Sequence, residues 1–218
     1  MTKLKLKLDL HVHSTYSPDA FNTVDTIVQR ITELSFDGYA LADHDSIDGL
    51  REAEEKKGDL SFIPALEVSA KGVHILVLDP TELVDSELSM AETVDLIHDQ
   101  GATAVLAHPY GLPRSWVSLN QVKEASFDAI EVANSAQIPY NYICRLNKRL
   151  AEKLNLPMTG GSDSHIPETI GRSYTIVETD SRESDDVVQA IKAGHTSVGG
   201  SNTRITEWLS KNIKKKKG

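Results

Sequence analysis

The sequence predicts an α/β fold in which strands and helices alternate along a single domain. Short apolar stretches with the spacing of strands are separated by stretches with the spacing of helices, an order typical of parallel strands joined by crossover helices. The length of 218 residues is enough for one domain with a full hydrophobic core. No linker, internal repeat or low-complexity segment precedes the lysine-rich end. A closed barrel and an open doubly wound sheet both fit this pattern.

The expected strands are recognised by alternating or continuous apolar residues. In the first strand, Leu4, Leu6, Leu8 and Leu10 alternate with polar residues. Further strands are expected at 39–42, 62–68, 73–78, 103–107, 128–132, 156–160 and 174–178. In parallel α/β folds the chemistry gathers at the carboxyl ends of such strands, so polar residues there are the first candidates for a functional site.

The expected helices combine apolar residues at helical spacing with end signals. Thr23 is a plausible N-cap for the first helix, and Ser89 and Glu92 have the spacing of a capping box. Glycines end two of the helices. The expected ranges are 24–34, 47–57, 89–101, about 137–154 and 184–194.

Composition excludes several classes of protein. No run of about 18 apolar residues is present, so no membrane span is expected, and the N-terminus lacks the apolar region of a signal peptide. The net charge of −9 argues against a broad nucleic-acid-binding face. Cys144 is the only cysteine, which excludes an intramolecular disulfide and a cysteine-rich zinc site. We therefore expect a cytoplasmic protein in which Cys144 is a small, buried or half-buried apolar residue.

Histidine and carboxylate side chains recur beside the expected strands. His11 and His13 lie one residue apart at the end of the first strand, so both imidazoles point to one face. Six of the eight histidines of the chain occupy such places, which is hard to attribute to chance. The complete set is His11, His13, Asp19, His44, Glu67, His74, His108, Asp163 and His165.

This mixture of side chains indicates a metal centre. Imidazole and carboxylate ligands suit Zn, Mn or Fe better than Mg or Ca. Each ion takes roughly four to six ligands, so nine side chains indicate two or three ions that share bridging carboxylates such as Glu67 or Asp163. His98 and His195 lie on or after helices and are expected to be structural. Asp43 and Asp45 flank His44 and are expected to support it or to serve the fold.

Other catalytic arrangements do not fit. The stretch GGSDS lacks the lysine and the spacing of a phosphate-binding loop. The sequence also contains neither a Gly-x-Ser-x-Gly elbow nor an HExxH motif.

The motifs taken together resemble the PHP family, named for polymerase and histidinol phosphatase domains. The matching pieces, in family order, are HVHS (11–14) with Asp19, DHD (43–45), ALEVS (65–69), His74, AHP (107–109) and GSDSH (161–165). The resemblance implies a single-domain, TIM-like, distorted seven-stranded (β/α) barrel with a trinuclear metal site, of which the nine residues above are the ligands. It implies a PHP phosphoesterase domain at 1–200, closed by a strand and helix, and a helical, basic tail at 201–218.

The third ligand position indicates a branch of this family. Asp19 stands where the histidinol phosphatase pattern often has histidine, so the chain looks more like the small stand-alone phosphoesterases. Relatives in that branch act on nucleotides that carry a 3′ and a 5′ phosphate, or trim short RNA from the 5′ end. The stretch 110–127 is too short for the helical cap domain of some relatives, so we expect an open cleft.

The resemblance implies a metal-dependent phosphoric ester hydrolase that uses a metal-activated water. Asp163, Glu67 and His165 are the expected catalytic residues. Arg172, Arg114 and Arg145 are candidates for phosphate contacts, and Tyr110 either stacks on a base or packs in its loop. The expected substrate is a phosphorylated small molecule or nucleotide, or a short single-stranded nucleic acid, and neither duplex DNA nor a membrane is expected as a partner. The alternatives are a histidinol-phosphatase-like or general phosphomonoesterase and a non-catalytic or DNA-repair-associated module.

Overall fold

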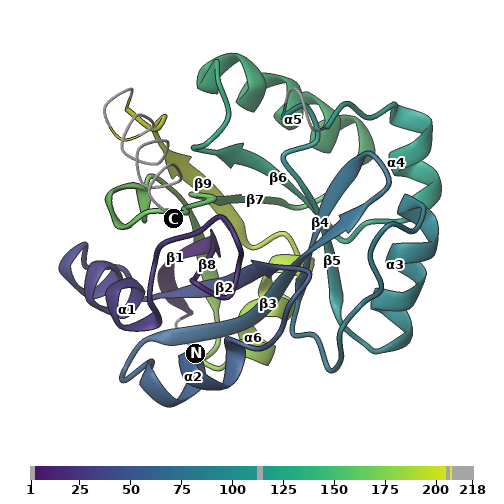
Figure 1. Ribbon diagram of the computed structural model, residues 1–218. Coiled ribbons are helices and arrows are strands. Elements are labelled where there is room, and N and C mark those ends of the chain that lie inside the picture. Colours follow the sequence, from purple (N-terminus) through teal and green to yellow (C-terminus); the bar gives the residue numbers. More distant parts are fainter. Residues whose placement is uncertain (1–2, 112–114, 205–206, 208–218) are drawn as a thin grey trace.

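The computed structural model describes residues 3–111, 115–204 and 207. Strands and helices alternate along the chain, as predicted (Figure 1). The elements are β1 (Leu4–Val12), α1 (Val24–Glu33), β2 (Gly38–His44), α2 (Leu50–Lys56), β3 (Ser61–Ala70), β4 (Val73–Leu78), α3 (Met90–Asp99), β5 (Thr103–Ala107), α4 (Leu119–Ala125), β6 (Ala129–Asn134), α5 (Tyr140–Leu154), β7 (Met158–Gly161), a 3₁₀ turn (Pro167–Thr169), β8 (Ser173–Thr179), α6 (Ser184–Lys192) and β9 (Thr196–Gly200).

The strands form one mixed sheet of nine in the described part of the chain, ordered β7-β6-β5-β4-β3-β2-β1-β8-β9. The prediction of seven strands is therefore wrong, because β8 and β9 extend the sheet beyond β1. The alternation indicated parallel strands with crossover helices, but β4 is antiparallel to both β3 and β5. Only Lys71 and Gly72 separate β3 from β4, and so short a connection can join only antiparallel strands.

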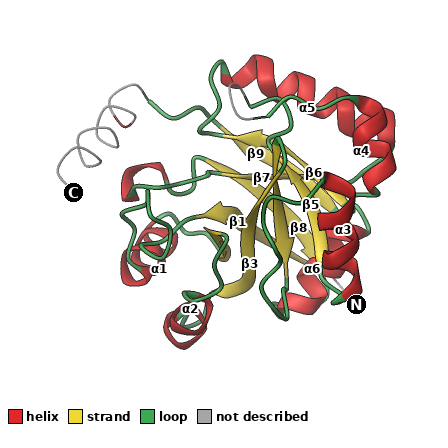
Figure 2. Ribbon diagram, turned by 45° about the vertical axis from the view of Figure 1, so that its right-hand side comes forward, coloured by secondary structure: helices red, strands yellow, loops and turns green. Residues whose placement is uncertain are grey.

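The sheet curls into a nearly closed barrel because β7 returns to β1. The backbone N–H of Ser162 donates to Asp9 across this seam at 2.8 Å, and that of Asp163 donates to the carbonyl of His11 at 2.8 Å. A Cβ atom at Gly161 would lie 2.4 Å from the Cβ of His11, so only glycine allows this approach. Figure 2 shows the strands at the centre of the molecule with helices around them.

The strand period separates an apolar interior from a polar end. Ala40 and Ala42 of β2 and Ile63 and Ala65 of β3 belong to one buried cluster, which α6 joins through its apolar side chains. Continuing by two residues along these strands reaches His44 and Glu67. The same alternation that fills the barrel with apolar side chains therefore delivers ligand-type side chains at its carboxyl end.

The helix end signals are largely confirmed. The Thr23 side chain accepts from the backbone N–H of Thr26, and Ser89 and Glu92 form both bonds of a capping box. Helix α4 was not predicted, although Ser118 and Gln121 form a second capping box at its start. No helix in the described ranges is long and apolar enough to cross a membrane.

The predicted tail at 201–218 is described only at 201–204 and 207, and its remaining residues lie outside the described part.

Candidate metal centre

All nine predicted ligand side chains gather at one end of the barrel. They come from β1, β2 and β3, from the start of β4, and from the loops that follow β1, β5 and β7. Most of them are buried, and Asp19, His44, His74 and Asp163 are half-buried. Three overlapping groups have ligand atoms close enough to share an ion. These groups are His13, His44 and His165; His11, His13 and Asp163; and His44, Glu67 and His74.

Glu67 lies at the centre of the cluster, with its two oxygens facing different histidines. Its Oε1 lies 2.9 Å from Nδ1 of His74 and 3.1 Å from Nε2 of His108. Its Oε2 lies 3.0 Å from Nδ1 of His44, 3.3 Å from Nε2 of His13 and 3.4 Å from Nε2 of His11. Such a carboxylate is placed to bridge two ions.

Asp163 and His165 complete the opposite side of the cluster. The Oδ1 atom of Asp163 lies 3.2 Å from Nε2 of His13 and 3.5 Å from Nδ1 of His165. Nε2 of His165 lies 3.3 Å from a carboxylate oxygen of Asp19. These two carboxylates bring the loops after β1 and β7 to the same spot.

The electrostatics of the cluster are those of a site built for cations. Burial alone would raise the pKa of Glu67 and of Asp163, but the surrounding imidazoles outweigh burial and hold both pKa values well below their usual range. Burial lowers the pKa of His13 to about 3, helped by the neighbouring His165. Burial also opposes the charged form of His11, yet Glu131, Glu67 and Asp163 raise its pKa well above the ordinary value. The carboxylates are therefore ionised and demand positive charge.

Several buried ligand atoms lack the hydrogen bonds that burial normally requires. Oε2 of Glu67 and Nε2 of His165 make none within the described residues, although other polar atoms lie close to both. Nε2 of His11 and Nε2 of His13 lie 3.1 Å apart, and at most one of them can donate to the other. Bound metal ions would satisfy these atoms, and the donor set of imidazoles and carboxylates suits Zn, Mn or Fe. The residues present thus fit a metal centre.

Two residues that support the cluster were missed by the sequence analysis. Nδ1 of His11 donates to Oε1 of Glu131 at 3.0 Å, so Nε2 is the ring nitrogen of His11 that faces the cluster. Oε2 of Glu131 accepts from the backbone N–H of His108 and from the side chain of Asn134, both at 3.0 Å. Asn134 also donates to Asp163 at 3.2 Å. The sequence did contain a signal for Glu131: it is a glutamate inside the apolar stretch DAIEV. It lies two residues after the inward-facing Ala129, so its side chain points to the same face of the strand.

The supporting role expected of Asp43 agrees with its contacts. Its carboxylate accepts from the backbone and hydroxyl of Ser14 at 2.7 and 2.6 Å and from the hydroxyl of Ser17 at 2.6 Å. Ser17 in turn accepts from the backbone N–H of His44 at 3.0 Å. Asp45 accepts from the backbone N–H of Ser69, which joins β2 to β3.

The backbone is strained at two of the proposed ligands. His108 has φ of 30° and Asp163 has φ of 53°, in the left-handed region that side chains other than glycine rarely adopt. Such positions persist only where the surroundings hold them, and they concentrate at functional sites. With this backbone conformation, both side chains point into the cluster from positions just after the ends of β5 and β7.

The remaining histidines and the candidate arginines lie apart from the cluster or engage other partners. His98 pairs with Asp128 at 2.9 Å, and His195 is exposed after α6. The guanidinium of Arg172 contacts the carboxylate of Glu207, so any anion bound by Arg172 has to replace that contact. Arg145 is exposed on α5. Arg114 lies outside the described residues.

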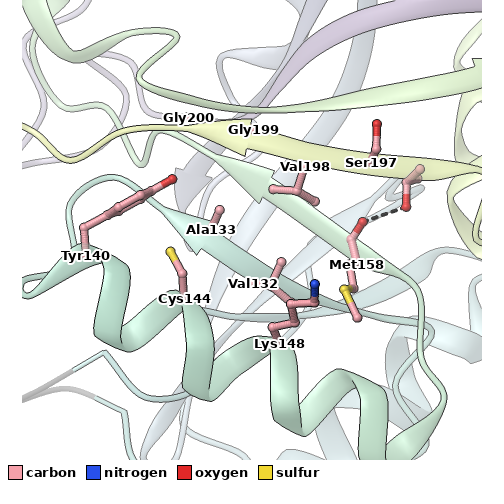
Figure 3. A pocket seen from close by; sticks show the side chains of 11 residues that line it. Val132, Ala133, Tyr140, Cys144, Lys148, Met158, Ser197, Val198, Gly199 and Gly200 are labelled. Carbon is pink, nitrogen blue, oxygen red and sulfur yellow. Dashed lines mark hydrogen bonds between the residues drawn. The ribbon is translucent and has the colours of Figure 1, made fainter.

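A separate cavity of about 490 Å³ lies between α5 and β9, away from the nine ligands (Figure 3). Its floor is apolar and includes Val132 and Met158, and Lys148 stands at its edge. Cys144 lines this cavity and is half-buried, as expected, and burial raises the pKa of its thiol. A thiol with a raised pKa is a poor nucleophile, so Cys144 remains a packing residue.

Comparison with known proteins agrees with the motifs. A family model described as PHP-associated matches residues 143–196. An uncharacterized protein of Methanocaldococcus jannaschii is 28% identical over 181 residues, which are 78% of this chain and 69% of that protein.

Two solved structures share the fold. One is a two-domain protein of Bacteroides vulgatus, described as containing a predicted PHP-like metal-dependent phosphoesterase. It matches with a TM-score of 0.70 at 22% identity, over 97% of this chain and 70% of that chain. The other is the lesion-specific endonuclease of Pyrococcus furiosus, with a TM-score of 0.72 at 20% identity over 89% of this chain and 58% of that chain. The chain therefore shares its fold with PHP-like metal-dependent phosphoesterases, and part of it matches the PHP-associated family model.

Proposed function

We propose that the protein is a metal-dependent phosphoesterase of the stand-alone PHP branch. Its substrates would be phosphate esters of small molecules or nucleotides, with a 3′,5′-bisphosphate nucleotide or a short oligonucleotide favoured. The observation that carries this proposal is the convergence of nine imidazole and carboxylate side chains at one end of the barrel, with Glu67 at their centre. Two or three ions of Zn, Mn or Fe would be held there by these nine residues.

Bound ions would activate a water molecule and neutralise the oxygens of the phosphoryl group. The residues of the cluster then have different roles. Glu67 holds the site together by facing histidines on both of its oxygens. Asp163 and His165 lie at the edge of the cluster, where either can accept a proton from the attacking water or return one to the leaving oxygen. No covalent intermediate with the protein is required.

The structure offers several observations against the alternatives. All nine ligand positions are filled: seven of these residues form groups with close ligand atoms, His108 contacts Glu67, and Asp19 contacts His165, which disfavours a module that has lost its chemistry. Asp19 in the third ligand position disfavours histidinol phosphate as the substrate. Similarity in fold to a lesion-specific endonuclease keeps DNA repair as the second candidate, but the net charge of −9 disfavours long duplex DNA. A cytoplasmic location is part of the proposal, since the single cysteine gives no sign of an oxidising compartment.

A panel of phosphate esters tests the proposal. Metal-loaded protein is assayed with phosphomonoesters, phosphodiesters and bisphosphate nucleotides, beside a matched preparation of Glu67→Gln. We expect hydrolysis of bisphosphate nucleotides with the highest kcat/KM, and loss of all hydrolysis in the variant. A preference for simple monoesters would favour a general phosphatase, and equal activity in both preparations would mean that the activity belongs to a contaminant.

A further inference from the structure

A large aromatic side chain is exposed beside the candidate metal centre. Trp116 leaves 62% of its surface open to solvent, the largest fraction among the exposed large apolar residues of the described chain. Its ring lies 5.1 Å from the ring of Tyr110, centre to centre, at an interplanar angle of 57°. Single exposed apolar residues are common, but here two aromatic rings lie together and form a larger apolar surface.

Tyr110 links this pair to the candidate metal centre. It follows His108 by two residues, which span at most about 7 Å. The backbone N–H of Gly111 donates to the carbonyl of His108 at 2.8 Å, so the chain turns at this point. Because the rings of Tyr110 and Trp116 lie 5.1 Å apart, Trp116 also stays near the end of β5.

The residues on either side of Trp116 are held in the protein interior, so the fold itself keeps the Trp116 side chain exposed. Ser115 and Val117 on either side of it are buried. Tyr110 packs against the outer hydrophobic core, and its backbone N–H donates to the buried Asn147 at 3.3 Å. One side of the Trp116 ring therefore rests on an anchored ring while the rest faces solvent.

Two further exposed apolar side chains lie after β6. Ile138, in the loop before α5, is 61% exposed, and Tyr142, in the first turn of α5, is 57% exposed. The loop of Ile138 meets the loop of Tyr110, since a Cβ atom at Gly111 would lie 2.5 Å from the side chain of Gln137. Every nucleobase has an aromatic face, and stacking on an aromatic side chain is strong enough to change affinity by roughly 5- to 150-fold per base.

We propose that Trp116, supported by Tyr110, is the stacking surface for the nucleobase of a substrate whose phosphate ester reaches the metal centre. This inference rests on the proposed phosphoesterase function and narrows its substrates to nucleotides and the ends of single strands. In this proposal, Trp116 determines which substrates bind and takes no part in the chemical step.

Two substrates that differ only in the base give a matched test. Adenosine 5′-monophosphate and ribose 5-phosphate carry the same ester on the same sugar, so Trp116→Ala should lower kcat/KM for the first at least fivefold and leave the second within twofold. Trp116→Phe should restore much of the loss, because it restores a ring. Leu96→Ala, an exposed apolar residue on α3, is the control and should affect neither substrate. Equal changes for the two substrates in Trp116→Ala would overturn the proposal.

A binding measurement separates this proposal from the proposed function. The chain has two tryptophans, so Trp208→Phe leaves Trp116 as the only strong fluorophore. In metal-loaded protein that also carries Asp163→Asn, and should therefore turn over at least 100-fold more slowly, we expect adenosine 5′-monophosphate to quench this fluorescence saturably and ribose 5-phosphate to leave it unchanged. Absence of quenching would refute the stacking surface even if the enzyme hydrolyses phosphate esters. Quenching, combined with a metal-loaded wild-type protein that hydrolyses no phosphate ester, would support the stacking surface and refute the proposed phosphoesterase function.

Discussion

Replacing Glu131 by glutamine perturbs the metal centre through a residue that contacts no proposed ion. Glu131 is buried and uses both oxygens as acceptors, one for the ring N–H of His11 and the other for the backbone of His108 and the side chain of Asn134. Glutamine keeps the shape but has only one acceptor, because its other terminal atom is an NH₂ donor. Both orientations of the amide therefore create a conflict between donors.

The two conflicts have different consequences. If the NH₂ group faces His11, the ring must accept at Nδ1 and carry its proton on Nε2, the atom that faces the cluster. If the NH₂ group faces His108 and Asn134, two buried donors lose their acceptor, at a cost of about 1–3 kcal/mol each. Loss of such a supporting carboxylate typically weakens metal affinity by about 10- to 100-fold, equivalent to roughly 1.4–2.8 kcal/mol. We expect Glu131→Gln to fall in this range.

The assay is a competition titration of metal-depleted protein with Zn²⁺ against a chromophoric chelator. Circular dichroism of the same samples reports whether the variant is folded. Glu178→Gln is the matched control, because Glu178 pairs with Lys5 on the exposed face of β8 and its loss should matter little. A folded Glu131→Gln protein with metal affinity within twofold of the wild type would refute the role assigned to Glu131.

Further predictions concern the cluster and its surroundings. Asp163→Asn should lower turnover at least 100-fold, as for a lost electrostatic stabiliser, while His98→Ala should stay near the wild type because the ring of His98 pairs with Asp128 and not with the cluster; equal losses would mean that the wrong histidines were assigned. Arg172→Ala should lower kcat/KM for a 3′,5′-bisphosphate nucleotide by a factor equivalent to roughly 2–4 kcal/mol of transition-state binding, and it should leave kcat/KM for simple monoesters unchanged. Glu207→Gln should raise kcat/KM for the bisphosphate nucleotide, because it removes the carboxylate that competes for Arg172. No change in either variant would exclude Arg172 from substrate binding. Chelation should lower the melting temperature by about 5–10 °C, since metal at 100 times its Kd stabilises by about 2.7 kcal/mol, and an unchanged midpoint by calorimetry would contradict metal binding to the folded state. Metal affinity should fall as the pH is lowered from about 8 to about 6, because the raised pKa of His11 means that metal must displace its proton, while His13, with a pKa of about 3, stays neutral throughout; an affinity independent of pH in the titration would contradict this.

Much of the fold and most of the site could be predicted from local sequence patterns. The two-residue period of the strands predicts which side chains face inward, and it placed Glu67 and His44 above the apolar interior. The family motifs added the remaining ligands. The predicted strands and helices agree with the structure because each depends only on residues close together in the sequence, and the ligand roles stay predictions.

Some of the omissions have their physical origin in long-range contacts, and others left a local signal that was overlooked. The closure of β7 on β1 depends on Asp9, Ser162 and Gly161, which lie far apart in the sequence and carry no periodic signal. The same holds for Glu131, whose partner His11 lies 120 residues away. The antiparallel pairing of β4 was readable in principle from the short turn at Lys71 and Gly72. Helix α4 was readable from its capping box, Ser118 and Gln121.

Metal content is the most direct test of the central claim that the nine clustered side chains form a metal centre for ester hydrolysis. Protein purified without chelator is analysed by elemental mass spectrometry, and hydrolysis of a bisphosphate nucleotide is measured before chelation, after it, and after metal is returned. The account predicts two or three first-row transition ions per chain, loss of hydrolysis on chelation and recovery on reconstitution. Less than one ion per chain, together with hydrolysis that strong chelators leave untouched, would contradict it.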